Sequence, residues 1–169
     1  GNLFRMRGDG ANIHQIGKST LHEGHATLLN DGRLLYDRWE YVDRSQVHYH
    51  HLWTANPDGT APMTCFGNLE PGVVMIDSKP VPGGEKLVSV FSPGHGQKEH
   101  AGPLAIVDPK AGPDSKDSVR MLTRAQDSRD PWAFSEKCVL SARGNSLVLL
   151  YDSGREEKLF TLPENESKA

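Results

Sequence analysis

Short apolar runs, each preceded by a glycine-containing turn, restrict the fold of this chain more than any other feature. Such runs stand at positions 34–36, 87–91 and 147–151, and the turn glycines before them, Gly32, Gly84 and Gly144, lie 52 and 60 residues apart. Continuous apolar runs of this length between turn residues are typical of strands that are buried on both faces. Gly or Pro interrupts every longer window, so we expect no helix of consequence.

A second series of strands lies between the members of the first. It comprises positions 3–6, 52–55, 104–107 and 159–162, which are more polar and are followed in several cases by an Asp-containing turn. Two kinds of strand therefore alternate with a repeat of about 50 to 60 residues, somewhat above the length of a typical propeller blade. This pattern predicts an all-β fold, a partial β-propeller of about three four-stranded blades. A β-sandwich with irregular loops is the alternative.

The whole chain, residues 1–169, is interpreted as a single propeller segment. Residues 2–16 would form the outer half of one blade, 21–66 and 73–122 a blade each, and 133–162 a shortened blade. Closed propellers have about 4 to 8 blades. We therefore expect an arc that belongs to, or assembles into, a ring of roughly six to eight blades. The missing blades would come from the rest of a longer chain, or from a second copy in a homodimer that closes the ring.

Composition excludes several classes of function. The 19 basic and 22 acidic residues give a net charge of −3 and are spread along the chain, so we expect no nucleic-acid partner. No apolar stretch is long enough for membrane insertion. Cys65 and Cys138 belong to no CxxCH motif, which excludes covalently attached haem. The chain shows no signal peptide and opens on Gly1, which we interpret as the sign of an excised segment.

Three segments carry a resemblance to known propeller repeats. Residues 3–10 and 52–60 resemble the strand-and-turn of Tol-type, WD-like propellers, and residues 29–36 resemble its companion strand. The run DGRLLYDRWEY at 31–41 resembles the propeller region of bacterial proteins similar to the hydrazine synthase alpha subunit. The resemblance implies a multi-domain, exported protein in a periplasmic or extracellular location. The haem chemistry of such proteins rests on CxxCH sites, so it is not carried over.

Histidine is the one enriched functional residue type, with eight copies in the chain. His48 and His50 are two positions apart, so in a strand they point to the same face. Neutral imidazole suits Zn, Cu or Fe. The candidate metal ligands are His22, His25, His48, His50 and His95. The alternative is that these histidines form hydrogen bonds between blades, as in WD-type repeats.

Charged residues cluster after the first apolar run. Asp37, Arg38 and Glu40 flank Trp39, and Asp43 and Arg44 follow. The run favours ion pairs between blades around a packed tryptophan, while Arg38 and Arg44 offer an alternative as an anion site. Turn aspartates elsewhere are expected to bond their own backbone.

Two functions follow from these observations. The first is a non-catalytic binding or scaffold module of a larger bacterial envelope protein, with a protein, glycan or other small molecule as its ligand. It draws support from the lack of a GxSxG motif or any other recognised nucleophile. The alternative is one part of a histidine-lined, metal-dependent redox or hydrolytic enzyme that resembles the hydrazine synthase alpha group.

Overall fold

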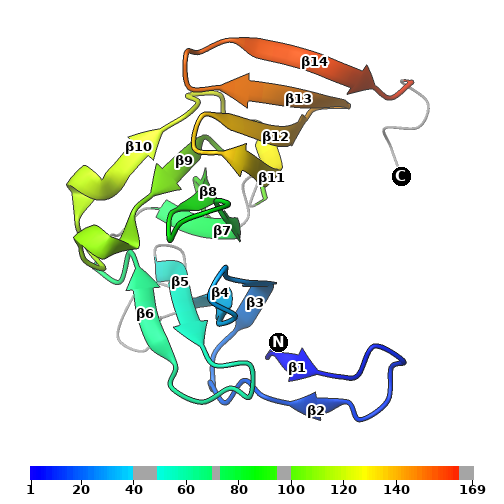
Figure 1. Cartoon of the computed structure of the whole chain (residues 1–169), viewed down its shortest axis with the longest axis vertical. Coiled ribbons are helices and arrows are strands. Elements are labelled where there is room, and N and C mark those ends of the chain that lie inside the picture. Colours follow the sequence, from blue (N-terminus) through cyan, green and yellow to red (C-terminus); the bar gives the residue numbers. More distant parts are fainter. Residues whose placement is uncertain (40–48, 70–72, 95–99, 164–169) are drawn as a thin grey trace.

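The chain folds into antiparallel β-sheets that are stacked one on another and leave their ends open (Figure 1). The computed structural model describes residues 1–39, 49–69, 73–94 and 100–163. A small hairpin of β1 (Phe4–Arg5) and β2 (His14–Gln15) precedes three groups of four strands. The all-β class expected from the sequence is confirmed, and helical structure in the described residues is limited to two single-turn 3₁₀ segments at Pro109–Ala111 and Lys116–Ser118.

The three groups follow one another along the chain in the same order of antiparallel pairing. The first holds β3 (Glu23–Leu28), β4 (Leu34–Trp39), β5 (Tyr49–Ala55) and β6 (Met63–Phe66). The second holds β7 (Val73–Pro80), β8 (Leu87–Ser92), β9 (Leu104–Val107) and β10 (Val119–Met121). The third holds β11 (Ser128–Ser135), β12 (Cys138–Arg143), β13 (Ser146–Tyr151) and β14 (Glu156–Thr161). A short parallel pairing of β5 with β7 joins the first two groups into one sheet of eight strands.

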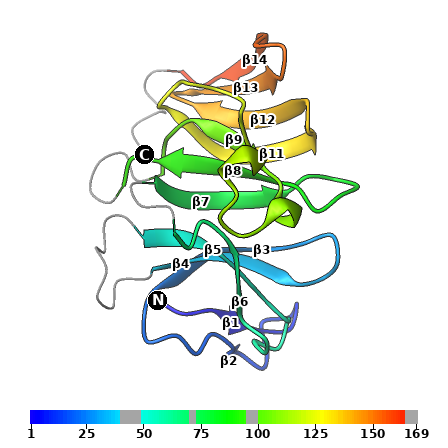
Figure 2. The ribbon, with the colours of Figure 1, turned by 90° about the vertical axis from the view of Figure 1, so that its left-hand side faces the viewer.

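The middle group is buried on both faces. Figure 2 shows it as a layer between the first and third groups. On one face Ile76, Val88 and Val90 pack against Val139 and Leu150 of the third group. On the other face, Met75, Leu87 and Val107 pack against the first group. Their partners there are Leu35, Leu52 and Phe66. This explains why residues 87–91 are apolar apart from Ser89, as expected of a doubly covered strand.

The third group departs from the sequence prediction in two ways. It is a complete four-stranded sheet that begins at Ser128, whereas a shortened unit from position 133 was expected. The polar start of β11, with Pro131 inside it, conceals this strand from pattern recognition. In addition, β13 is buried on one face only, because nothing among the described residues covers the other.

The uncovered face of the third group is apolar. Its exposed side chains are Trp132 and Phe134 on β11, Leu147 on β13 and Phe160 on β14. Leu147 and Phe160 are direct cross-strand partners, so they lie on the same face of the sheet. So many exposed large apolar side chains on one sheet face are unusual for the free surface of a protein. No helix among the described residues has the length and apolar character needed to cross a membrane.

Candidate metal centre

Irregular pairing in β3 and β7, the first strands of their groups, sets the orientation of two candidate ligands. The register of β3 with β4 shifts between Gly24 and Thr27, and that of β7 with β8 shifts between Ile76 and Lys79. His25 and Asp77 lie inside these shifts and take left-handed backbone conformations, with φ of 47° and 50°. A non-glycine residue in this region costs about 1 to 3 kcal/mol, and such strain is concentrated at functional sites. Bulges beside a site commonly redirect a side chain.

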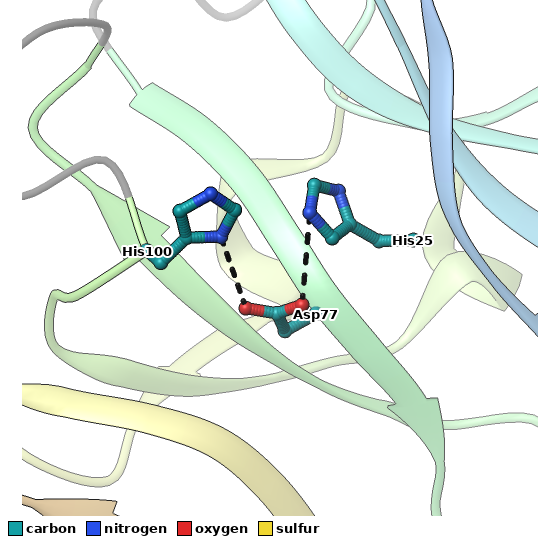
Figure 3. A group of neighbouring side chains, drawn as sticks. All are labelled: His25, Asp77 and His100. Atoms are coloured by element: carbon teal, nitrogen blue, oxygen red, sulfur yellow. Dashed lines mark ion pairs between the residues drawn. The ribbon is translucent and has the colours of Figure 1, made fainter. Parts of the chain in front are cut away.

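These two side chains meet a third residue, His100, from the segment before β9 (Figure 3). The Asp77 carboxylate lies between the two imidazoles, with Oδ1 at 3.9 Å from His25 Nε2 and Oδ2 at 3.7 Å from His100 Nδ1. The ring centroids of the two histidines are 5.1 Å apart. One donor atom from each of the three residues lies within 4.8 Å of the others. Exposure rises from Asp77 to His25 to His100, so the cluster opens toward solvent on the His100 side.

A buried carboxylate, that of Asp37, forms a hydrogen bond with the ring nitrogen of His25 that faces away from Asp77. Asp37 on β4 is 1% exposed, and its Oδ1 accepts a hydrogen bond of 2.6 Å from His25 Nδ1. Its Oδ2 bonds with Nε2 of His50, a buried residue on β5. When Nδ1 of a neutral histidine carries the proton, Nε2 has a free lone pair. Hydrogen bonding to a carboxylate also fixes the ring and makes it a better metal ligand.

The pKa values of the site follow from this arrangement. Burial alone raises the pKa of Asp37, but the hydrogen bonds from His25 and His50 outweigh it and lower the pKa to about 2. The hydrogen bond to Asp37 raises the pKa of His25. Burial raises the pKa of Asp77, with His25 acting in the opposite direction. Asp37 is therefore an anion at neutral pH and a constant acceptor for both imidazoles.

Two imidazoles and one carboxylate suit a first-row divalent metal ion. Metal–ligand bonds of about 2.1 Å place neighbouring donor atoms about 3.0 to 3.4 Å apart. The three donor atoms here lie within 4.8 Å of one another, which is slightly too far apart. Side-chain rotations that move each donor atom by about an ångström would bring them to bonding distance of one ion. Three protein ligands leave further coordination positions open for water or an added ligand.

The predicted ligands divide into three groups. His25 and His50 come together, on the two oxygens of Asp37. His22 lies beside His50, with ring centroids 6.3 Å apart, but its Nδ1 lies 2.6 Å from the amino group of Gly1. His48 and His95 lie outside the described residues.

Sequence reasoning missed Asp37, Asp77 and His100 as members of the site. Asp37 was placed in a charge run that would form ion pairs between blades, and its partners are in fact histidines. A signal for Asp77 existed, because it follows His25 by 52 residues, the same spacing that separates the turn glycines Gly32 and Gly84. No local pattern marks His100.

Acid should remove part of the stability of the fold through Asp37. Its pKa is depressed in the folded state, so the stabilisation is fully present above the unfolded value near pH 4 and disappears as the pH falls toward 2. Linkage gives a loss of about 2 kcal/mol. Urea unfolding of metal-free protein at pH 5 and pH 2.5 should show this loss, and Asp37→Asn should lack that component. An identical acid loss in the variant would contradict the assignment.

Comparisons with known proteins add little to this picture. No protein-family model matches the chain. No curated protein matches it either. Among solved structures, one that is similar is the tricorn protease, with 12% sequence identity and a TM-score of 0.35 over 92% of this chain and 18% of that chain. The present chain thus spans less than a fifth of the length of that protein.

Proposed function

We propose that this chain is a segment of a β-propeller that binds a first-row divalent metal ion through His25, Asp77 and His100. The observation that carries the proposal is the convergence of the three donors from separate parts of the fold, with Asp37 bonded behind His25. Binding, as opposed to catalysis, is the function that this arrangement supports best.

The propeller part of the proposal draws on the repeated organisation of the sheets. Three groups of four antiparallel strands stack face to face. Their first strands are β3, β7 and β11, and β7 lies in contact with both β3 and β11. Propeller blades are four-stranded sheets stacked around an axis, with the first strand of each innermost. The exposed apolar face of the third group, with Trp132 and Phe160, is the surface on which a further blade would pack.

Metal titration of the purified chain tests the proposal. We expect one equivalent of Zn²⁺ to bind, and Co²⁺ to give a visible absorption spectrum typical of nitrogen and oxygen ligands. Loss of a ligand should weaken binding by about 100-fold or more in His25→Ala and in His100→Ala. His14→Ala is the matched control, because His14 is exposed on the β1–β2 hairpin. The proposal fails if the wild-type chain binds no stoichiometric metal, or if both site variants bind as it does.

A metal-dependent hydrolytic enzyme is the second candidate function. It is favoured by the open coordination positions, since catalytic zinc sites have three protein ligands and a water. Bound metal lowers the pKa of that water to about 7 and so generates a nucleophile. Hydrolysis of a nitrophenyl ester or phosphate by the Zn²⁺-loaded chain, abolished in His25→Ala, would support this candidate over a pure binding role.

A further inference from the structure

Asp130 on β11 repeats the geometry of His25 and Asp77. It follows Asp77 by 53 residues, and Asp77 follows His25 by 52. Its φ is 45°, close to the 47° and 50° of the other two. The pairing of β11 with β12 shifts register between Arg129 and Trp132, so Asp130 lies in a bulge as they do. Each of the three strand groups therefore carries one strained residue of a metal-ligating type as the first residue of the bulge in its first strand.

We infer that Asp130 is a further ligand of the same metal site, contributed by the third strand group. This inference rests on the proposed function. It adds a second carboxylate to His25, Asp77 and His100, so that a divalent cation would be neutralised by two carboxylates. The class of ligand it favours is a divalent ion with a preference for oxygen donors, such as Mn²⁺ or Fe²⁺.

Strand packing brings Asp130 to the neighbourhood of the site, outside the set of three donors that lie within 4.8 Å of one another. Strand β11 lies against β7, the strand that carries Asp77. Asp77 and Asp130 occupy corresponding bulge positions of these two packed strands. Among the described residues Asp130 has no ion-pair partner, so its charge remains available to a cation.

The strain at Asp130 also favours a functional role. A left-handed conformation is tolerated better by Asp than by most residues, but it still costs free energy compared with Gly. A structural turn at this position would be made more easily by glycine. The presence of a carboxylate here is explained if a cation uses it, since two nearby carboxylates repel each other until a cation lies between them.

Metal selectivity is the readout that tests the inference. We expect Asp130→Asn to weaken Mn²⁺ binding by about tenfold and Zn²⁺ binding by about threefold, because Mn²⁺ depends more on oxygen ligands. Mn²⁺ is followed by electron paramagnetic resonance and Zn²⁺ by competition with a chromogenic chelator. Asp130→Gly is a second variant that removes the carboxylate and relieves the strained φ, so it should fold at least as well and show the same change. Asp152→Asn, in the exposed turn after β13, is the charge-matched control.

The outcomes separate this inference from the proposed function. If both Asp130 variants bind Mn²⁺ and Zn²⁺ as the wild type and Asp152→Asn do, while His25→Ala does not, Asp130 is no ligand and the three-residue site stands. If the wild type binds neither ion, the proposed function fails and the inference fails with it. A selective loss of Mn²⁺ affinity in both Asp130 variants supports the inference.

Discussion

Asp37→Ala should destabilise the fold by about 4 kcal/mol, one of the largest effects of any single substitution in this chain. The change removes a buried anion that bonds to two imidazoles from two other strands. It leaves polar nitrogens of His25 and the buried His50 without their acceptor, at a cost of about 1 to 3 kcal/mol each. The free energy of unfolding from urea denaturation of metal-free protein measures the effect.

Two further variants make this measurement specific. Asp37→Asn keeps the shape and one acceptor oxygen, so it should cost about half as much as the alanine variant. Asp152→Ala removes an exposed carboxylate and should change stability by less than about 0.5 kcal/mol. A loss below about 1 kcal/mol in Asp37→Ala would show that the histidine pair is held without the carboxylate.

Gly59→Ala should destabilise the fold by about 3 kcal/mol through backbone strain and a backbone clash. Gly59 ends the turn between β5 and β6 with φ of 81°, which an L-residue rarely adopts. A Cβ atom at this position would lie 2.1 Å from the carbonyl oxygen of Ile16, a backbone atom that cannot rotate away. The substitution therefore also pushes the β1–β2 hairpin segment off the first strand group.

Gly32 offers a matched control in the equivalent turn between β3 and β4. Its φ is 87°, but no atom lies within 4 Å of the position that a Cβ would take. Gly32→Ala should therefore cost only the strain, about 1 kcal/mol. Thermal unfolding compares the two, and limited proteolysis should cut the first 20 residues faster in Gly59→Ala alone. Equal effects of both substitutions would show that the contact with Ile16 contributes nothing.

The strands and turns could be predicted because their signals are local. The apolar runs at 34–36, 87–91 and 147–151 all lie in strands, and the turns at Gly32 and Gly144 take the left-handed conformation that glycine permits. Local patterning decides such features, since a strand buried on both faces needs an unbroken apolar run. The start of β11 was not predicted from the sequence, because Asp130 and Pro131 are residue types that are rare in strands.

The site was harder to predict because its contacts are long-range. His25 was a candidate from the sequence, but its carboxylate partners come from β4 and β7, which only the packed structure brings beside β3. Asp37 has the composition of a surface charge, and its burial depends on neighbours that no local window contains. The spacing of His25, Asp77 and Asp130 was the one long-range signal available, and it becomes visible only when bulges are sought as well as strands.

The repeated bulge has a consequence for how such a chain acquires new chemistry. Each strand group carries one such residue in the bulge of its first strand, while the packing of the groups depends on other residues, such as Ile76 and Val139. Exchange of a single residue per repeat thus alters the donor atoms without disturbing the hydrophobic layers. In a repeated unit of this kind, ligand preference and folding therefore depend on separate residues.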